Sequence, residues 1–107
     1  MTSPSLRYAP LMTPLDCPPH QVLLQKEVAS ALWSMAFQNG PNQKAIASAG
    51  GVPLLIGLLS KGSPEIHRDA AGALWSLAAD YAPNQQLIFE CGGIIPLVAL
   101  LQPGEDR

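Results

Sequence analysis

The sequence has few basic residues, few cysteines and no long apolar run, and each shortage argues against a class of function. Only six of its 107 residues are Lys or Arg, and the formal net charge is -2. Because phosphate binding requires clustered basic side chains, we expect no nucleic-acid partner. The two cysteines stand in unlike contexts, Cys17 in a proline-rich stretch and Cys91 at an alanine position of a repeat. They indicate a loop thiol and a small buried side chain, and neither a disulfide nor a metal site.

The apolar runs are too short to cross a membrane. The longest, GGVPLLIGLL and CGGIIPLVALL, are about ten residues long and contain Gly and Pro, whereas a transmembrane helix needs roughly 20 apolar residues. The first residues carry no long apolar stretch and no Gly after the initiator Met, so they predict neither a secretory signal nor myristoylation. We therefore expect no membrane span and a cytoplasmic location, with a nuclear location left open.

The chain contains an internal repeat, with two similar copies of one segment. Residues 29–51 read ASALWSMAFQNGPNQKAIASAGG and residues 71–93 read AGALWSLAADYAPNQQLIFECGG, so a shift of 42 residues aligns them without a gap. A period in the low forties is typical of helical solenoids and of propeller blades. No stretch alternates apolar and polar residues over a useful length, which argues against a propeller and predicts an all-α repeat fold. With 48% hydrophobic residues, the chain is expected to bury a core.

The second copy predicts one long helix followed by two short ones. Apolar residues at helical spacing indicate a long helix over residues 64–80, with Ser63 as its N-cap and a proline in its first position. Asn84 is expected to cap a short helix over residues 85–90, and a further short helix is expected over residues 94–101.

The first copy repeats these devices. A long helix is expected over residues 22–38, and Asn42 is expected to cap the short helix that follows it. The glycine pairs at residues 50–51 and 92–93 stop the short helices, since glycine accepts the left-handed conformation. Each pair follows one helix and precedes another, so we interpret them as corner glycines. A phosphate-binding loop would instead follow a strand.

The segment NQKAIASAGGVPLLIGLLSKGSPEIHRDAAGALWSLAADYAPNQQLIFECGGIIPLVALL resembles armadillo repeats. The resemblance covers residues 22–102 and is strongest to vacuolar-protein-like and plant armadillo scaffold proteins. It implies repeats of a short first helix, a second helix and a long third helix, with partner segments bound in a concave groove that the third helices line. The expected fold is a right-handed α-solenoid in which one full repeat, residues 42–80, is flanked by two partial ones.

Three regions are expected along the chain. Residues 1–20 contain five of the 11 prolines and are expected to form an irregular leader. Residues 21–102 are expected to form the armadillo-repeat segment, and residues 103–107 to begin a next third helix that is cut short, as in a fragment of a longer armadillo protein. Since solenoid repeats bury their apolar faces on neighbouring repeats, we expect the isolated chain to be partly molten or to self-associate through its uncapped ends.

No constellation of side chains predicts catalysis, a cofactor or a metal. Ser34 and Ser76 recur in the repeat, but no base that could activate them recurs nearby. His20 and His67 are not equivalent in the repeat and have no second ligand at metal-binding spacing, so we interpret them as surface residues. The sequence therefore predicts a non-enzymatic protein without a cofactor.

The candidate binding residues lie at i, i+4 spacing on the two third helices and are flanked by two tryptophans. They are Ser30, Trp33, Ser34 and Gln38 in the first copy, and Gly72, Trp75, Ser76 and Asp80 in the second. Tryptophan is enriched at binding hot spots, but a large aromatic side chain can equally fill the seam between repeats. The sequence leaves both roles open for Trp33 and Trp75.

The resemblance implies a scaffold that binds a partner protein or an extended peptide segment. A second interpretation is the substrate-recognition part of a larger ubiquitin ligase or kinase-associated protein, and a third is a karyopherin-like cargo carrier. Carriers of the importin-α type place a Trp and, four residues later, an Asn on the third helix. The matching positions here hold Ser30 and Ser34, then Gly72 and Ser76. Because neither copy has this Trp and Asn, the third interpretation is disfavoured.

Overall fold

The computed structural model describes residues 19–102, which contain six α-helices and no strand. The helices are α2 (Pro19–Ala36), α3 (Gly40–Ser48), α4 (Gly51–Leu58), α5 (Pro64–Ala78), α6 (Ala82–Glu90) and α7 (Ile94–Ala99). The predicted all-α class is confirmed for this part of the chain. The expected tail, residues 103–107, and all but the last two residues of the expected leader lie outside the described residues. No helix within residues 19–102 has the length and apolar character that a bilayer crossing requires.

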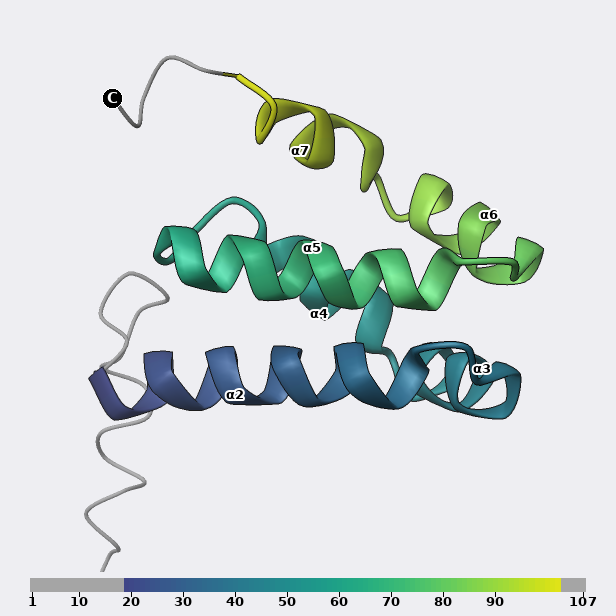
Figure 1. Cartoon of the computed structure of the whole chain (residues 1–107). Helices are drawn as coiled ribbons and strands as arrows, with labels where there is room; N and C mark the ends of the chain where they lie inside the picture. The colour runs from purple at the N-terminus through teal and green to yellow at the C-terminus, as the bar shows by residue number, and fades with distance from the viewer. Residues whose placement is uncertain (1–18, 103–107) are drawn as a thin grey trace, which may run out of the picture.

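Each long helix is followed by two short helices, in the order that the repeat predicts. Helices α3, α4 and α5 make one unit of two short helices and a long one, α2 is the long helix before it, and α6 and α7 are the two short helices after it. Figure 1 shows α2 and α5 side by side and running in the same direction, with α4 behind α5 and α3 at the C-terminal end of α2. One full repeat is therefore flanked by two partial ones, as expected.

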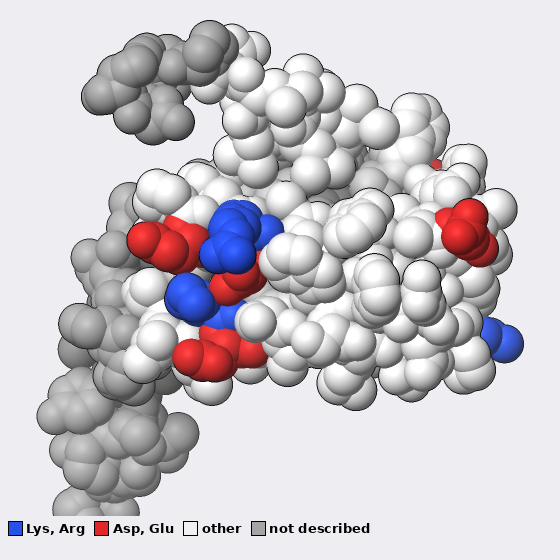
Figure 2. Space-filling view, viewed as in Figure 1, with Lys and Arg blue, Asp and Glu red and all other residues white. Residues whose placement is uncertain are grey.

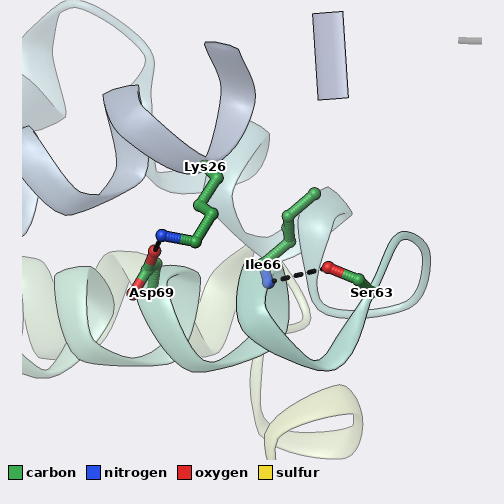
Figure 3. A network of polar contacts seen from close by, with 4 residues as sticks. All are labelled: Lys26, Ser63, Ile66 and Asp69. Atoms are coloured by element: carbon green, nitrogen blue, oxygen red, sulfur yellow. Dashed lines mark hydrogen bonds and ion pairs between the residues drawn. The ribbon is translucent and has the colours of Figure 1, made fainter. Parts of the chain in front are cut away.

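The start of the central long helix follows from its first residues. The Ser63 hydroxyl accepts a hydrogen bond from the Ile66 amide at 3.4 Å, and a proline occupies the first turn, where its missing N–H is not needed (Figure 3). At the corners after the short helices α3 and α6, Gly50 and Gly92 have φ angles of 90° and 80°. These values are left-handed, so the predicted cap and the predicted corner glycines are confirmed.

The predicted caps of the two short helices that follow α2 and α5 are wrong. Helix α3 is capped by Asn39, whose side chain accepts a hydrogen bond from the Asn42 amide at 3.0 Å, and α6 follows Tyr81. Both helices begin earlier than predicted because their prolines lie inside the first turn, where proline is tolerated, and not in front of it. Asn42 and Asn84 therefore lie inside the helices, and their side chains do not cap them.

The side chains of Asn42 and Asn84 instead bind carbonyl groups at the ends of the long helices, which have no partner within the helix itself. Asn42 Nδ2 donates to the Met35 carbonyl at 2.8 Å, and Asn84 Nδ2 donates to the Leu77 carbonyl at 2.9 Å. The two bonds are one repeat apart and join the same places. Asn84 Nδ2 also donates to the carbonyl of Gln43 at 3.0 Å, so it fixes the first helices of successive repeats to each other.

Gln43 completes the connection between the repeats. Its Nε2 donates to the Ser76 carbonyl at 2.7 Å and to the Ala79 carbonyl at 2.9 Å, both at the end of α5. The side chains of Gln43 and Asn84 are buried, so their hydrogen bonds form away from water. In the recurring Pro-Asn-Gln sequence, the Asn side chain thus fixes the corner between each long helix and the short helix after it, and Gln43 joins α3 to the end of α5.

Small residues let the two long helices approach each other closely. Ala29 and Ala36 of α2 and Ala70 and Ala73 of α5 all lie in the buried core. At Gly72 the approach is closer still, because a Cβ atom there would lie 2.3 Å from Cε3 of the Trp33 ring. No real Cβ contact is that short, so the packing of α2 on α5 requires glycine at this position.

We expect Gly72→Ala to lower the free energy of unfolding by about 1–3 kcal/mol, because the added methyl group must displace the buried edge of the Trp33 ring. Gly57→Ala is the matched control: nothing lies within 4 Å of a Cβ atom there, so the alanine should stabilise α4 by about 0.5–1 kcal/mol. Denaturant unfolding measures both. In the background Trp33→Ala the cost of Gly72→Ala should disappear, and an undiminished cost would contradict the proposed contact.

Candidate functional site

The two tryptophans hold the same place in the repeat but have different surroundings. Trp33 is half-buried, with its ring lying over Gly72 of the next long helix. Trp75 is 59% exposed, because no described helix covers it on that side. The two roles that the sequence left open are thus divided between the copies: Trp33 packs in the seam between α2 and α5, and Trp75 lies on the surface beside it.

Three aromatic side chains gather at this seam, and we call Trp33, Phe37 and Trp75 the aromatic cluster. The ring centroids of Trp33 and Trp75 are 6.4 Å apart and the rings stand at 76°, which is an edge-to-face arrangement. Those of Phe37 and Trp75 are 6.1 Å apart at 60°. Because Trp75 contacts both other rings, it stands at the centre of an exposed apolar surface.

The cluster borders a shallow hollow on the surface of α2. The residues that line this hollow are Ser30, Trp33, Ser34 and Phe37. Three of these four lining residues were predicted as site residues. The fourth, Phe37, was not predicted. The repeat holds the reason: Phe37 corresponds to Ala79 in the second copy, so a search for residues that recur passes over it. Its spacing of four residues from Trp33 is the signal that could have identified it.

The prediction needs correction at Gly72 and Ser76. Both are buried, because this side of α5 faces the neighbouring helices and not the solvent. Ser76 is 1% exposed, and its hydroxyl has no hydrogen-bond partner within the described residues. Neither residue can line a binding surface in this structure.

The prediction also misplaces Gln38 and Asp80, which were expected within the third helices. Helices α2 and α5 end at Ala36 and Ala78, two residues earlier than expected. Gln38 and Asp80 lie in the turns beyond these ends, with φ angles of 51° and 55°, and both are exposed. A left-handed conformation is uncommon for residues other than glycine, and its recurrence one repeat later shows that the turn is a feature of the repeat.

Charged side chains lie at the other end of the face that α2 and α5 form. Figure 2 shows acidic and basic side chains gathered over the N-terminal parts of these helices, whereas the middle of the face carries none. Lys26 Nζ lies 3.5 Å from Oδ2 of Asp69, whose side chain is almost entirely buried (Figure 3). This ion pair joins α2 to α5 and offsets part of the cost of burying the carboxylate, whose Oδ2 has no hydrogen bond within the described residues.

Glu65 is an exposed acid at this charged end. Its own backbone N–H and the Ser63 hydroxyl, and after them the positive charge of Lys26, hold the pKa of its carboxyl below the usual range. The carboxylate is therefore ionised at neutral pH and stands at the N-terminus of α5, where the helix dipole favours a negative charge.

No group of three or more His, Cys, Asp and Glu side chains within the described residues could hold a metal ion. The ring nitrogen Nε2 of His67 lies 3.0 Å from the Lys61 carbonyl, so this histidine is engaged with the turn before α5. Cys91 is a half-buried free thiol at the end of α6. What the surface offers is an apolar aromatic patch bordered by serine hydroxyls, which suits the binding of another molecule.

The arrangement of the helices and a match to a family model identify the kind of repeat in this chain. The unit of two short helices and a long one, stacked so that the long helices lie side by side, belongs to the helical-repeat proteins. Residues 41–79, which include α4, α5 and nearly all of α3, match the family model of the Armadillo/beta-catenin-like repeat. This part of the chain is an armadillo repeat, and such repeats generally bind proteins. No curated protein and no solved structure matches the chain.

The difference between the two tryptophans can be measured by fluorescence, because the chain contains no others. We expect acrylamide to quench the variant Trp33→Phe, which retains the exposed Trp75, more strongly than the variant Trp75→Phe in dilute solution. Both variants should be quenched equally in denaturant, which serves as the control. Equal quenching of the two folded variants would contradict the assignment of Trp33 to the seam.

Proposed function

We propose that the chain is a protein-binding module that takes up an extended segment of a partner protein on the face formed by α2 and α5, with the aromatic cluster as the anchor site. The observation that carries this proposal is the exposure of Trp75 between two other aromatic rings. An exposed apolar patch of this kind commonly marks an interaction site.

The chemistry of the patch defines the partner segment. Tryptophan contributes strongly to binding energy because it buries a large area with few rotatable bonds. An aromatic or large aliphatic side chain of the partner would pack on Trp75 and Phe37. The hydroxyls of Ser30 and Ser34, which line the hollow beside the cluster, can donate to and accept from the backbone of an extended segment.

The finer features of the module are part of the same proposal. We propose that residues 21–102 form a single armadillo segment and that the protein is a scaffold of the vacuolar-protein-like or plant type, acting in the cytoplasm. Cargo binding of the importin-α type finds no support, because Gly72 and Ser76, at the gripping positions of the second copy, are buried. No observation favours a role in a ubiquitin ligase over a scaffold.

The proposal is tested by selecting binders from a library of extended random peptides on the immobilised chain. We expect enriched peptides to share an aromatic or aliphatic anchor residue. Trp75→Ala and Phe37→Ala should each weaken binding about tenfold, the effect of removing a hot-spot residue, with little change in the free energy of unfolding because both residues are exposed.

Phe89→Ala is the matched control, since Phe89 is an equally exposed aromatic residue on α6, outside the aromatic cluster. Leu74→Ala is the folding control, because this residue is buried in the core and its truncation should cost roughly 2–5 kcal/mol of stability. Peptides that bind Trp75→Ala and Phe37→Ala as tightly as the original chain would show that the cluster is not the anchor site.

A further inference from the structure

Helix α2 exposes an apolar stripe that α5, one repeat later, buries. On α2 the stripe consists of Leu24, Val28, Ala31 and Met35, and the residues 42 positions later on α5 are Ile66, Ala70, Ala73 and Leu77. All four residues on α5 are at most 1% exposed, whereas Val28 is 47% exposed and Met35 is 51% exposed. The stripe on α2 is therefore built for contact but lacks, within the described residues, the helices that cover its counterpart.

The opposite end of the molecule has a matching open apolar face. An open apolar groove between α5, α6 and α7 is lined by residues that include Trp75, Ala78, Gln85, Ile94 and Leu97. The residues 42 positions earlier are Trp33, Ala36, Gln43, Val52 and Leu55. Most of these residues are buried. They lie on α2, α3 and α4, and α5 contacts all three of these helices. Ile94 is 51% exposed where its counterpart Val52 is fully buried.

We propose that these two faces bind each other, so that copies of the chain stack head to tail. Helix α2 of a second copy lies in the groove between α5, α6 and α7, in the register in which α5 lies on α2, α3 and α4 within one chain. The contact joins two different faces and leaves one of each free, so it continues into an open stack. The inference does not rest on the proposed function, although Trp75 contributes to both surfaces.

The charges follow the same register. Within the chain Lys26 on α2 pairs with Asp69 on α5 at 3.5 Å. One repeat away, Lys26 corresponds to Arg68 and Asp69 corresponds to Glu27, so both signs are retained. Stacking therefore brings Arg68 of one copy to Glu27 of the second copy, which is the same pair across the contact between molecules.

The buried amide also has a counterpart. Gln43 Nε2 donates to the carbonyls of Ser76 and Ala79 at the end of α5. The corresponding side chain, Gln85, is exposed and, within the described residues, donates only to the carbonyl of Ala78 at the end of α5 in its own chain. In the stack its amide reaches the carbonyls of Ser34 and Phe37 of the second copy, the residues 42 positions before Ser76 and Ala79.

One position departs from the register and limits the affinity of the stack. Trp33 lies against Gly72, which has no Cβ atom, whereas Trp75 must lie against Ser30 of the second copy. The Cβ atom of Ser30 occupies the place that the indole takes in the intramolecular contact, so Trp75 has to adopt another rotamer there. Removal of this Cβ atom should therefore strengthen the contact.

The experiment is sedimentation velocity of the full chain over a range of concentrations. We expect its mass to rise with concentration beyond that of a dimer. Val28→Glu blocks the α2 face and Ile94→Glu blocks the groove, so each variant alone should remain monomeric where the original chain assembles. Mixed in equal amounts they should form a heterodimer and nothing larger, because each retains the face that the other lacks.

The controls are Leu23→Glu on α2 and Ile95→Glu on α7. Both residues are exposed and apolar, but their counterparts one repeat away, Glu65 and Pro53, are exposed as well, so neither belongs to the contact. These variants should assemble like the original chain. Circular dichroism checks that every variant is folded, and formation of the heterodimer shows the same for the two blocked variants.

Ser30→Gly gives a test in the opposite direction. It should lower the concentration at half-assembly by at least about threefold, whereas Ser30→Ala, which keeps the Cβ atom, should not. The proposal is overturned if the original chain remains monomeric at all concentrations, in which case the faces accept a different partner. It is also overturned if the mixture of blocked variants stays monomeric, or if assembly stops at a dimer that Val28→Glu leaves intact.

Discussion

The close packing of α2 on α5 is the contact on which the rest of the structure depends. It is made possible by alanines on both helices and by the absence of a side chain at Gly72, over which the Trp33 ring lies. Close approach removes apolar surface from water and leaves little empty space, and both effects stabilise the folded chain. The same approach places Phe37 and Trp33 within contact of Trp75 on the neighbouring helix. The candidate binding surface is thus a consequence of how the repeats stack.

Buried amides hold the short helices α3 and α6 to the end of α5. Gln43 and Asn84 hold carbonyl groups at the end of α5 that would otherwise lack partners, and Asn84 also holds the backbone of α3 at Gln43. A buried carbonyl without a hydrogen bond costs free energy, so departures from this arrangement are disfavoured. The aromatic cluster therefore stands beside helices held by buried hydrogen bonds, which in the proposed function would lower the entropy lost on binding a partner.

Local signals in the sequence identified the helices, but they gave neither the correct caps of α3 and α6 nor the faces along which the helices pack. Ser63 and the corner glycines predict where elements begin and end because their effects depend on the backbone near them. The roles of Asn84 and Ser76 depend on which other helix lies opposite, and no periodicity in one copy contains that information. Comparison of the copies identified Trp33 and Trp75 as equivalent but could not show that a helix covers one and not the other. Phe37 corresponds to Ala79, which is not aromatic, so the same comparison missed it.

The account makes α5 the central element, packed by α2, α3 and α4 on one side and by α6 on the other. Native-state hydrogen exchange of the dilute monomer tests this most directly, because amides in well-packed helices open only with most of the structure, whereas those of a helix covered on one side open locally. The amides of α5 between Ala70 and Leu77 should exchange most slowly, and those of α7 and the first turns of α2 markedly faster. Exchange in α7 as slow as in α5 would contradict the central place of α5 and, with it, the two open faces on which the stacking of copies depends.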